Sequence, residues 1–254
     1  MASLLEVSNL SKSFGGVHAV QSVGFKVDAG IVYSVIGPNG AGKTTLFNLI
    51  TGVYTPDAGS IRLNGEPIEG KPPTMLARRG VARTFQNLQV YMNMSALENV
   101  MVGAHLHLDR NPLKAALRFP SIRRGDQSIA ERAAELMDFV GLGKFVNAHA
   151  DSLSYGMLKR LEIARALALK PRLIFLDEPA AGLNPKETEG VAELIREVSN
   201  SGVTVVLVEH DMKMVMKLSD RILVMDYGKA LTEGTAEEVR NNPQVIAAYL
   251  GAQA

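Results

Sequence analysis

Residues 37 to 44 read Gly-Pro-Asn-Gly-Ala-Gly-Lys-Thr, and they follow directly on an apolar run at 31–36. This is the pattern G-x-x-x-x-G-K-[ST], whose glycine-rich backbone closes around the phosphates of a nucleotide. A helix that starts near Lys43 directs the positive end of its dipole at the same phosphates. Lys43 can reach the β- and γ-phosphates, and the Thr44 hydroxyl can bind Mg²⁺. The residues of the predicted phosphate site are Gly37, Pro38, Asn39, Gly40, Ala41, Gly42, Lys43, Thr44 and Thr45.

The bulk composition is that of an ordinary globular protein. Of the 254 residues, 46% are hydrophobic and 21% are charged. The net charge is +1, and this near-balance argues against nucleic acid as the main partner, because binding to its phosphates needs a basic excess. There is no cysteine, which excludes disulfides, cysteine-bound zinc and thiol catalysis.

No apolar run approaches the roughly 20 residues of a membrane span. The first residues, Met-Ala-Ser-Leu-Leu-Glu-Val, lack the basic and apolar regions of a signal peptide. We therefore expect a soluble intracellular protein that reaches a membrane only through a partner.

The two ends of the chain alternate short apolar runs with turns, which predicts strands and βα units. Predicted strands cover 4–7, 17–20, 23–27, 31–36, 60–63, 81–85, 173–176, 203–208, 221–225 and 229–232. The first three are expected to form an antiparallel group that leads into the phosphate-loop strand at 31–36, and Asn64-Gly65 predicts a hairpin turn. Predicted helices cover 44–51, 129–140, 158–169, 186–199 and 211–218, with two short ones at the end. The segment from Ser95 to about residue 170, which opens with a capping box at Ser95 and Glu98, is a helical block inside an α/β core.

Two carboxylates follow the apolar strand at 173–176, namely Asp177 and Glu178. In a parallel sheet they would lie at the same edge as the phosphate loop. Asp177 would then hold Mg²⁺ through its water shell, and Glu178 would polarise the water that attacks the γ-phosphate. The alternative, an ordinary acidic turn, is less compatible with the loop at 37–44.

A third motif, Leu153-Ser-Tyr-Gly-Met, precedes a predicted helix, where Ser154 and Gly156 can form an anion site. It resembles the signature motif of ABC ATPases, usually Leu-Ser-Gly-Gly-Gln. The resemblance implies that Ser154 and Gly156 contact the γ-phosphate held by the other subunit of a dimer. Tyr155 and Met157 depart from the pattern, and Met157 cannot make the polar contacts of glutamine.

Further positions match the same family. The resemblance assigns Gln86 to the Q-loop, where it senses Mg²⁺ and water, and His210 to the H-loop, within reach of the γ-phosphate. Asn184 stands where aspartate is commoner in the D-loop. Phe14 falls where an aromatic ring stacks on adenine, with Val20 as a second wall. The guanine-reading motif Asn-Lys-x-Asp is absent, which favours ATP over GTP.

The resemblance covers the whole chain and implies the fold of a P-loop NTPase ABC cassette. We expect one ABC ATPase domain over 1–254, with a RecA-like core and antiparallel β subdomain at about 1–90 and 171–254. A helical subdomain at 91–170 would be inserted into it, with a basic excursion at 105–125. This excursion is either a surface near anionic lipid or a permease, or a solvated helical segment. His105 and His107 lack a nearby carboxylate, so we predict no metal there.

Longer stretches, such as residues 177–187 and 209–216, are similar to the larger ATP-binding subunit of branched-chain amino acid importers. This implies ATP and Mg²⁺ as ligands, and a second ABC ATPase as partner in a heterodimer or homodimer. It also implies two permeases, a solute-binding protein outside the cell and a place on the cytoplasmic face of the inner membrane. Alternatives are import of urea or another small polar solute, lipopolysaccharide export, a soluble ABC ATPase of DNA repair or translation, and a regulator without turnover.

Overall fold

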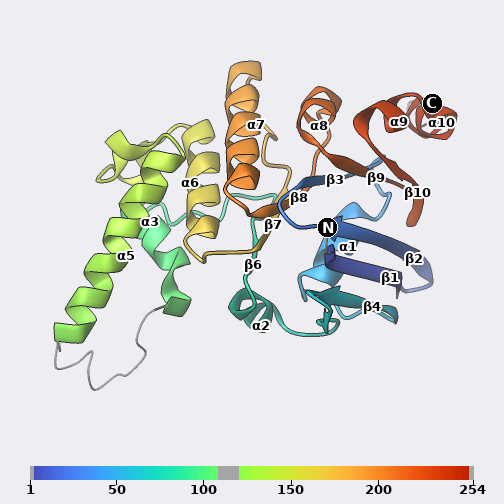
Figure 1. Cartoon of the computed structure of the whole chain (residues 1–254). Coiled ribbons are helices and arrows are strands. Elements are labelled where there is room, and N and C mark those ends of the chain that lie inside the picture. The colour runs from blue at the N-terminus through green and yellow to red at the C-terminus, as the bar shows by residue number, and fades with distance from the viewer. Residues whose placement is uncertain (1–2, 108–119, 252–254) are drawn as a thin grey trace. The chain divides into compact units, whose positions relative to one another are not determined.

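The computed structural model describes residues 3–107 and 120–251 and divides into two compact units (Figure 1). The phosphate-loop unit comprises Met1–Arg83 and Arg172–Ala254. The helical unit is Thr84–Pro171. Among the helices of the described ranges, none is both long and apolar enough to cross a bilayer.

A six-stranded sheet of order β10-β9-β3-β8-β7-β6 carries the phosphate loop. Its strands are β3 (Val32–Ile36), β6 (Val81–Arg83), β7 (Leu173–Asp177), β8 (Thr204–Val208), β9 (Arg221–Asp226) and β10 (Lys229–Gly234). All neighbours are parallel except β9 and β10. Val208 is in register with both Val35 and Asp177, so the carboxyl ends of β3, β8 and β7 meet at one edge. That edge is where ligands bind in open α/β sheets.

A four-stranded antiparallel sheet of order β2-β1-β4-β5 belongs to the same unit. It consists of β1 (Ser3–Phe14), β2 (Val17–Asp28), β4 (Ala58–Leu63) and β5 (Glu66–Pro67). The predicted hairpin turn is confirmed, with left-handed φ values of 50° at Asn64 and 77° at Gly65.

The predicted antiparallel group is wrong in one respect. The runs at 17–20 and 23–27 form the single strand β2, because Ser22 adopts φ 47° and the pairing register shifts there. Val20 and Val23 therefore both face the core although they lie three residues apart. The run at 31–36, predicted as the strand before the phosphate loop, forms β3 of the parallel sheet.

The hydrophobic core follows from the two-residue period of the strands. On β9, Leu223 and Met225 join the large core cluster that includes α1 (Lys43–Ile50) and the antiparallel sheet. Ile222 and Val224 face the opposite side, with Val215 of α8 (Met212–Leu218). Phe47 and Phe175 meet edge-to-face at 5.1 Å, which fixes α1 against β7.

Helices α7 (Pro185–Asn200) and α8 lie on the same side of this sheet in Figure 1, and α7 contacts β8 and β3. The helices of the phosphate-loop unit are α1 (Lys43–Ile50), α2 (Pro73–Arg78), α7 (Pro185–Asn200), α8 (Met212–Leu218), α9 (Ala236–Arg240) and α10 (Pro243–Gly251). Asn184 begins α7 with a capping box: its side chain accepts hydrogen bonds from the N–H groups of Lys186 and Glu187, each at 3.0 Å. The D-loop asparagine thus has a structural role as a helix cap.

The helical unit contains α3 (Ala96–Gly103), α5 (Pro120–Phe139), α6 (Tyr155–Leu167) and the 3₁₀ turns His105–His107, Gly143–Phe145 and Ala150–Ser152. The capping box at Ser95 and Glu98 is confirmed. Residues 108–119 of the predicted basic excursion, with Arg110, Lys114 and Arg118, lie outside the described residues.

Candidate functional site

The phosphate loop presents unused backbone donors at the start of α1. Gly42, the residue before the helix, has φ 97°, and no side chain caps the helix. A Cβ at Gly37 or Gly42 would collide with the carbonyl oxygen of Met225 or Ala19, so both positions require glycine. The first N–H groups of α1 are therefore available to an anion.

Lys43 lies at the centre of this loop. Its ammonium donates hydrogen bonds to the carbonyl oxygens of Gly37 at 2.7 Å and Pro38 at 2.9 Å. Burial lowers the pKa of Lys43, and the carboxylates of Glu178 and Asp177 oppose that shift. Hydrogen bonds to charged acceptors are stronger than those to neutral carbonyls, so the Lys43 ammonium can exchange these carbonyls for the oxygens of a phosphate.

Asp177, at the end of β7, forms a buried ion pair with Arg83 of β6 at 3.1 Å. Arg83 also donates to the side chains of Asn48 and Thr51, each at 2.7 Å. This pairing of Arg83 was not predicted from the sequence. The pair holds the Asp177 carboxylate in place at the sheet edge.

The site offers oxygen ligands that suit Mg²⁺. Asp177 supplies a carboxylate, and Thr44 is exposed in the first turn of α1. Within the described residues, no group of three or more acidic or histidine side chains is arranged so that it could hold a metal ion by itself. Mg²⁺ retains several waters and is usually bound by one or two protein groups plus substrate phosphates, so this sparse set fits.

Glu178 and His210 are brought together by β7 and β8. The Nε2 atom of His210 lies 2.7 Å from Oε1 of Glu178. Glu178 adopts φ 50°, a left-handed conformation that is costly for glutamate, and its N–H donates to the Val208 carbonyl at 3.0 Å. The strained backbone directs the carboxylate to the histidine. An ionised carboxylate only accepts, so Nε2 then carries the proton.

Glu209 is a residue that sequence reasoning missed. It is buried, and its carboxylate accepts hydrogen bonds from the N–H groups of Ala180 at 2.7 Å and His210 at 3.0 Å. Burial raises the pKa of Glu209, whereas the donating N–H groups lower it. Glu209 thereby ties the loop after β7 to the loop after β8. An acidic residue between an apolar strand and His210 was the available signal.

The predicted base-stacking residues differ in accessibility. Phe14 is 42% exposed and meets Tyr54 edge-on at 5.3 Å, so its ring can contact a ligand. Val20 is 1% exposed within the core, which leaves it no surface for a base. The structure thus supports Phe14 alone of this pair.

The signature segment starts α6 in the helical unit. Ser154 is the cap residue, exposed, and its hydroxyl accepts from the Met157 N–H at a long 3.4 Å. Gly156 is buried in the first turn. The Lys159 ammonium lies 5.8 Å from the centre of the Tyr155 ring, over its face. Gln86, also in the helical unit, is exposed.

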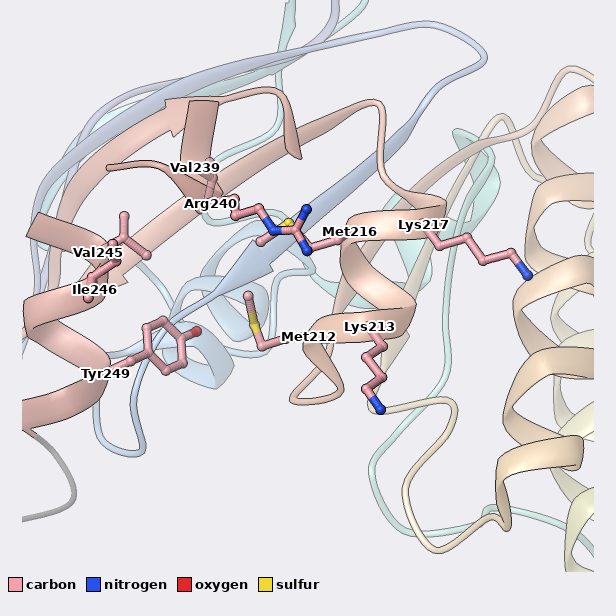
Figure 2. A pocket seen from close by; sticks show the side chains of 9 residues that line it. All are labelled: Met212, Lys213, Met216, Lys217, Val239, Arg240, Val245, Ile246 and Tyr249. Atoms are coloured by element: carbon pink, nitrogen blue, oxygen red, sulfur yellow. The ribbon is translucent and has the colours of Figure 1, made fainter. Parts of the chain in front are cut away.

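The last helices form a groove of about 640 Å³ in the phosphate-loop unit. Its lining residues come from α8, α9 and α10: Met212, Lys213, Met216, Lys217, Val239, Arg240, Val245, Ile246 and Tyr249. Figure 2 shows Tyr249 directed from α10 towards Met212. The Tyr249 hydroxyl accepts a hydrogen bond from the Gly37 N–H, while burial raises its pKa to about 12. The C-terminal helix thus contacts the first residue of the phosphate loop.

Comparison with known proteins accords with this geometry. The sequence model of the ABC transporter family matches residues 20–181, and a model described as branched-chain amino acid ATP-binding cassette transporter matches residues 231–254. The chain is 51% identical to the high-affinity branched-chain amino acid transport ATP-binding protein BraF of Pseudomonas aeruginosa, over 98% of both proteins. It is 47% identical to the corresponding LivG protein of Escherichia coli K12, again over 98% of each.

A solved structure shares the fold. It is the ADP conformation of MJ1267, an ATP-binding cassette of an ABC transporter, with a TM-score of 0.87 and 32% identity. The match covers 99% of this chain and 100% of the other. The chain therefore belongs to the ABC transporter family, as one of its ATP-hydrolysing, ATP-binding cassettes.

Proposed function

We propose that this chain powers the import of branched-chain amino acids by hydrolysing ATP. The 51% identity over 98% of both chains to BraF, a high-affinity branched-chain amino acid transport ATP-binding protein, carries the proposal. The second family match falls on residues 231–254, a segment outside the generic cassette match at 20–181.

The proposed reaction uses the residues of the phosphate-loop unit. The free N–H groups of α1, with Lys43, hold the phosphate tail of ATP. Glu178 accepts a proton from the attacking water, and His210, 2.7 Å away, keeps the carboxylate oriented. Phe14 stacks on the base. These roles need positioning and charge neutralisation, which is what phosphoryl transfer chiefly requires.

Mg²⁺ would be held by Thr44 and Asp177, and it would neutralise charge on the transferred phosphate. The family pattern adds Gln86 as a contact to the metal and its water. Removal of Mg²⁺ by a chelator is expected to abolish hydrolysis while leaving the fold intact, because Asp177 is already paired with Arg83.

The proposed assembly has two cassettes, two permeases and a solute-binding protein outside the cell, on the cytoplasmic face of the inner membrane. Ser154 and Gly156 would complete the ATP site of the second cassette. The exposed cap of α6, with its long hydrogen bond of 3.4 Å between the Met157 N–H and the Ser154 hydroxyl, supports this role.

The test is purification from gently solubilised membranes, followed by reconstitution into liposomes with internal ATP. Recovery of a different cassette and two permeases, with uptake of labelled leucine that Glu178→Gln abolishes, would support the proposal. Uptake of urea but not leucine would reassign the solute. Recovery of self-copies alone with an export-type permease pair would overturn import.

A further inference from the structure

The segment Phe85–Tyr91 of the helical unit has no helix or strand of its own, yet its backbone is held by side chains. Gln86, the proposed Q-loop residue, lies within it. Backbone groups outside regular structure still need partners, so the residues that supply them decide the shape of the segment. Two helices, α6 and α3, supply these partners.

Three charged residues on one face of α6 contact the start of the segment. Glu162 accepts hydrogen bonds from the N–H groups of Gln89, at 3.4 Å, and Phe85. Lys159 donates to the Gln86 carbonyl at 3.5 Å, and Arg165 donates to the Gln89 carbonyl. Positions 159, 162 and 165 are spaced by three, so they stand on the same side of the helix.

Burial makes these contacts consequential. Lys159 is 2% exposed and Glu162 is 3% exposed. A buried charge costs free energy unless it is paired and hydrogen-bonded, and here each is compensated by its neighbours and by the segment. If one of these charges is removed, the backbone groups of the segment lose a hydrogen-bond partner. If the segment changes its conformation, the buried charges lose theirs.

The end of the segment is held in the same manner by α3. The buried Asn99 side chain accepts from the Tyr91 N–H at 2.8 Å and donates to the Tyr91 carbonyl at 3.0 Å. The outer side remains accessible, with Phe85 44% and Tyr91 50% exposed. The segment is thus held by α6 and α3 on one side and is exposed to solvent on the other.

We propose that Glu162 is a positioning residue of the ATPase: with Lys159 and Arg165 it fixes Phe85–Tyr91 to α6, so that Gln86 and the signature residue Ser154 are carried by one helix. We call the contacts of these three side chains with the segment the brace. The role of Gln86 in the ATPase rests on the proposed function, whereas the brace rests on the contacts alone. Because of the brace, the segment Phe85–Tyr91 would move together with the start of α6. Without the brace, the position of Gln86 would no longer be tied to that of Ser154.

The experiment compares the full-length chain with Glu162→Gln, which keeps the side-chain size but removes the charge. Amide hydrogen exchange is followed for residues 85–91 and for the strands of the phosphate-loop unit. The expected result is exchange about tenfold faster at 85–91 alone, since charge-assisted hydrogen bonds are lost. The matched control is Glu135→Gln, because Glu135 is exposed on α5 in the same unit.

ATPase kinetics of the same variants supply the functional readout. Glu162→Gln is expected to lower kcat about tenfold, with KM for ATP within about twofold of the parent, because the ATP-binding loop lies elsewhere. Arg165→Gln, whose parent side chain is only partly buried, should loosen the same segment and repeats the test if Glu162→Gln fails to fold.

Unchanged exchange at 85–91 in both variants overturns the brace, and loosened exchange with unchanged kcat overturns the positioning role. Gln86→Ala separates this from the proposed function. If Gln86→Ala hydrolyses ATP at the parental rate, the assigned role of Gln86 is wrong even where the exchange result upholds the brace.

Discussion

Helices α1 and α6 both begin at proposed anion sites, but they use their first N–H groups differently. The start of α1 has Gly42 in a left-handed conformation and no side-chain cap. The start of α6 is capped by its own Ser154, through one hydrogen bond of 3.4 Å. At α1 no side-chain cap competes with a phosphate for the first N–H groups. At α6 a phosphate must displace the Ser154 hydroxyl from the Met157 N–H or share that donor with it. We infer that α1 binds ATP by itself and α6 acts on ATP that is already bound.

Helix α7 extends this comparison. Asn184 occupies its first N–H groups with two hydrogen bonds of 3.0 Å, and Glu187 completes the capping box. Such a terminus has no donors left for a ligand. The three helix starts thus range from open, through weakly capped, to closed.

Among the three helix starts, the largest expected effect comes from breaking the open terminus. Lys43→Ala removes the cation that the loop holds over Gly37 and Pro38. We expect ATP affinity to fall roughly 100-fold, the value of a charge-assisted hydrogen bond to phosphate together with its charge. Titration calorimetry of the purified chain measures it.

Lys26→Ala is the control for that change, because Lys26 is an exposed lysine paired with Glu6 on the antiparallel sheet. Its ATP affinity should match that of the parent. Equal ATP affinity in Lys43→Ala and the parent would refute the assignment of the phosphate loop.

A smaller effect is expected at the weakly capped terminus. Ser154→Ala should lower turnover about tenfold, through loss of one hydrogen bond to a charged phosphate in the assembled pair. ATP affinity of the isolated chain should stay within about twofold. Steady-state ATPase assays at several protein concentrations, with Ser152→Ala as the neighbouring control, measure the difference. A loss of ATP affinity in the isolated chain would show that α6 is a primary site.

The closed terminus should respond in stability alone. Asn184→Ala removes both cap hydrogen bonds and should lower the free energy of unfolding by about 1 kcal/mol. Asn184→Asp keeps the cap and should retain parental stability. Urea denaturation measures both variants, and a fall in ATP affinity without loss of stability would contradict the purely structural role.

The smallest effect is expected at Glu209, whose carboxylate accepts hydrogen bonds from the N–H groups of Ala180 and His210. In the proposed site a phosphate would play the same part as acceptor for the N–H groups of α1. Its folded-state pKa is raised above the ordinary 4.5, mainly by burial, with nearby Glu178 contributing. The folded state then binds the proton more tightly than the unfolded state. The associated stability is present below about pH 4.5 and is lost as pH rises through the raised pKa.

Glu209→Gln does not titrate, so the parent should lose stability relative to this variant as pH rises from about 4.5 to neutrality. Unfolding free energies of both proteins across that range measure the difference. A difference that is constant with pH, or of opposite slope, would contradict the assigned burial of the charge.

The features that could be predicted from the sequence have a local signal. The phosphate loop and the paired Asp177 and Glu178 of the candidate site, like the capping box at Ser95 in the fold, each lie within a few consecutive residues. The parts that were missed depend on partners far apart in the chain. Arg83 pairs with Asp177, and Glu209 bonds to Ala180, only because parallel strands bring them together.

The bulge at Ser22 explains the other error. The alternation of core-facing and outward-facing side chains is interrupted between Val20 and Val23. Without knowledge of the strand pairing, such an interruption predicts two short strands in place of one. Val20 was predicted as a second wall of the base-binding site, whereas the bulge turns its side chain into the core. Register is a property of two strands, so one strand's sequence could not provide it.

The most direct test of the central claim is to measure ATP binding and hydrolysis together in Glu178→Gln. In the proposed reaction, binding depends on α1 and Lys43, whereas hydrolysis depends on the carboxylate that His210 contacts at 2.7 Å. We predict parental ATP affinity, turnover reduced by roughly 10²–10⁴, as for loss of a general base, and an ATP-bound dimer that persists on gel filtration. Parental turnover in this variant would contradict the account.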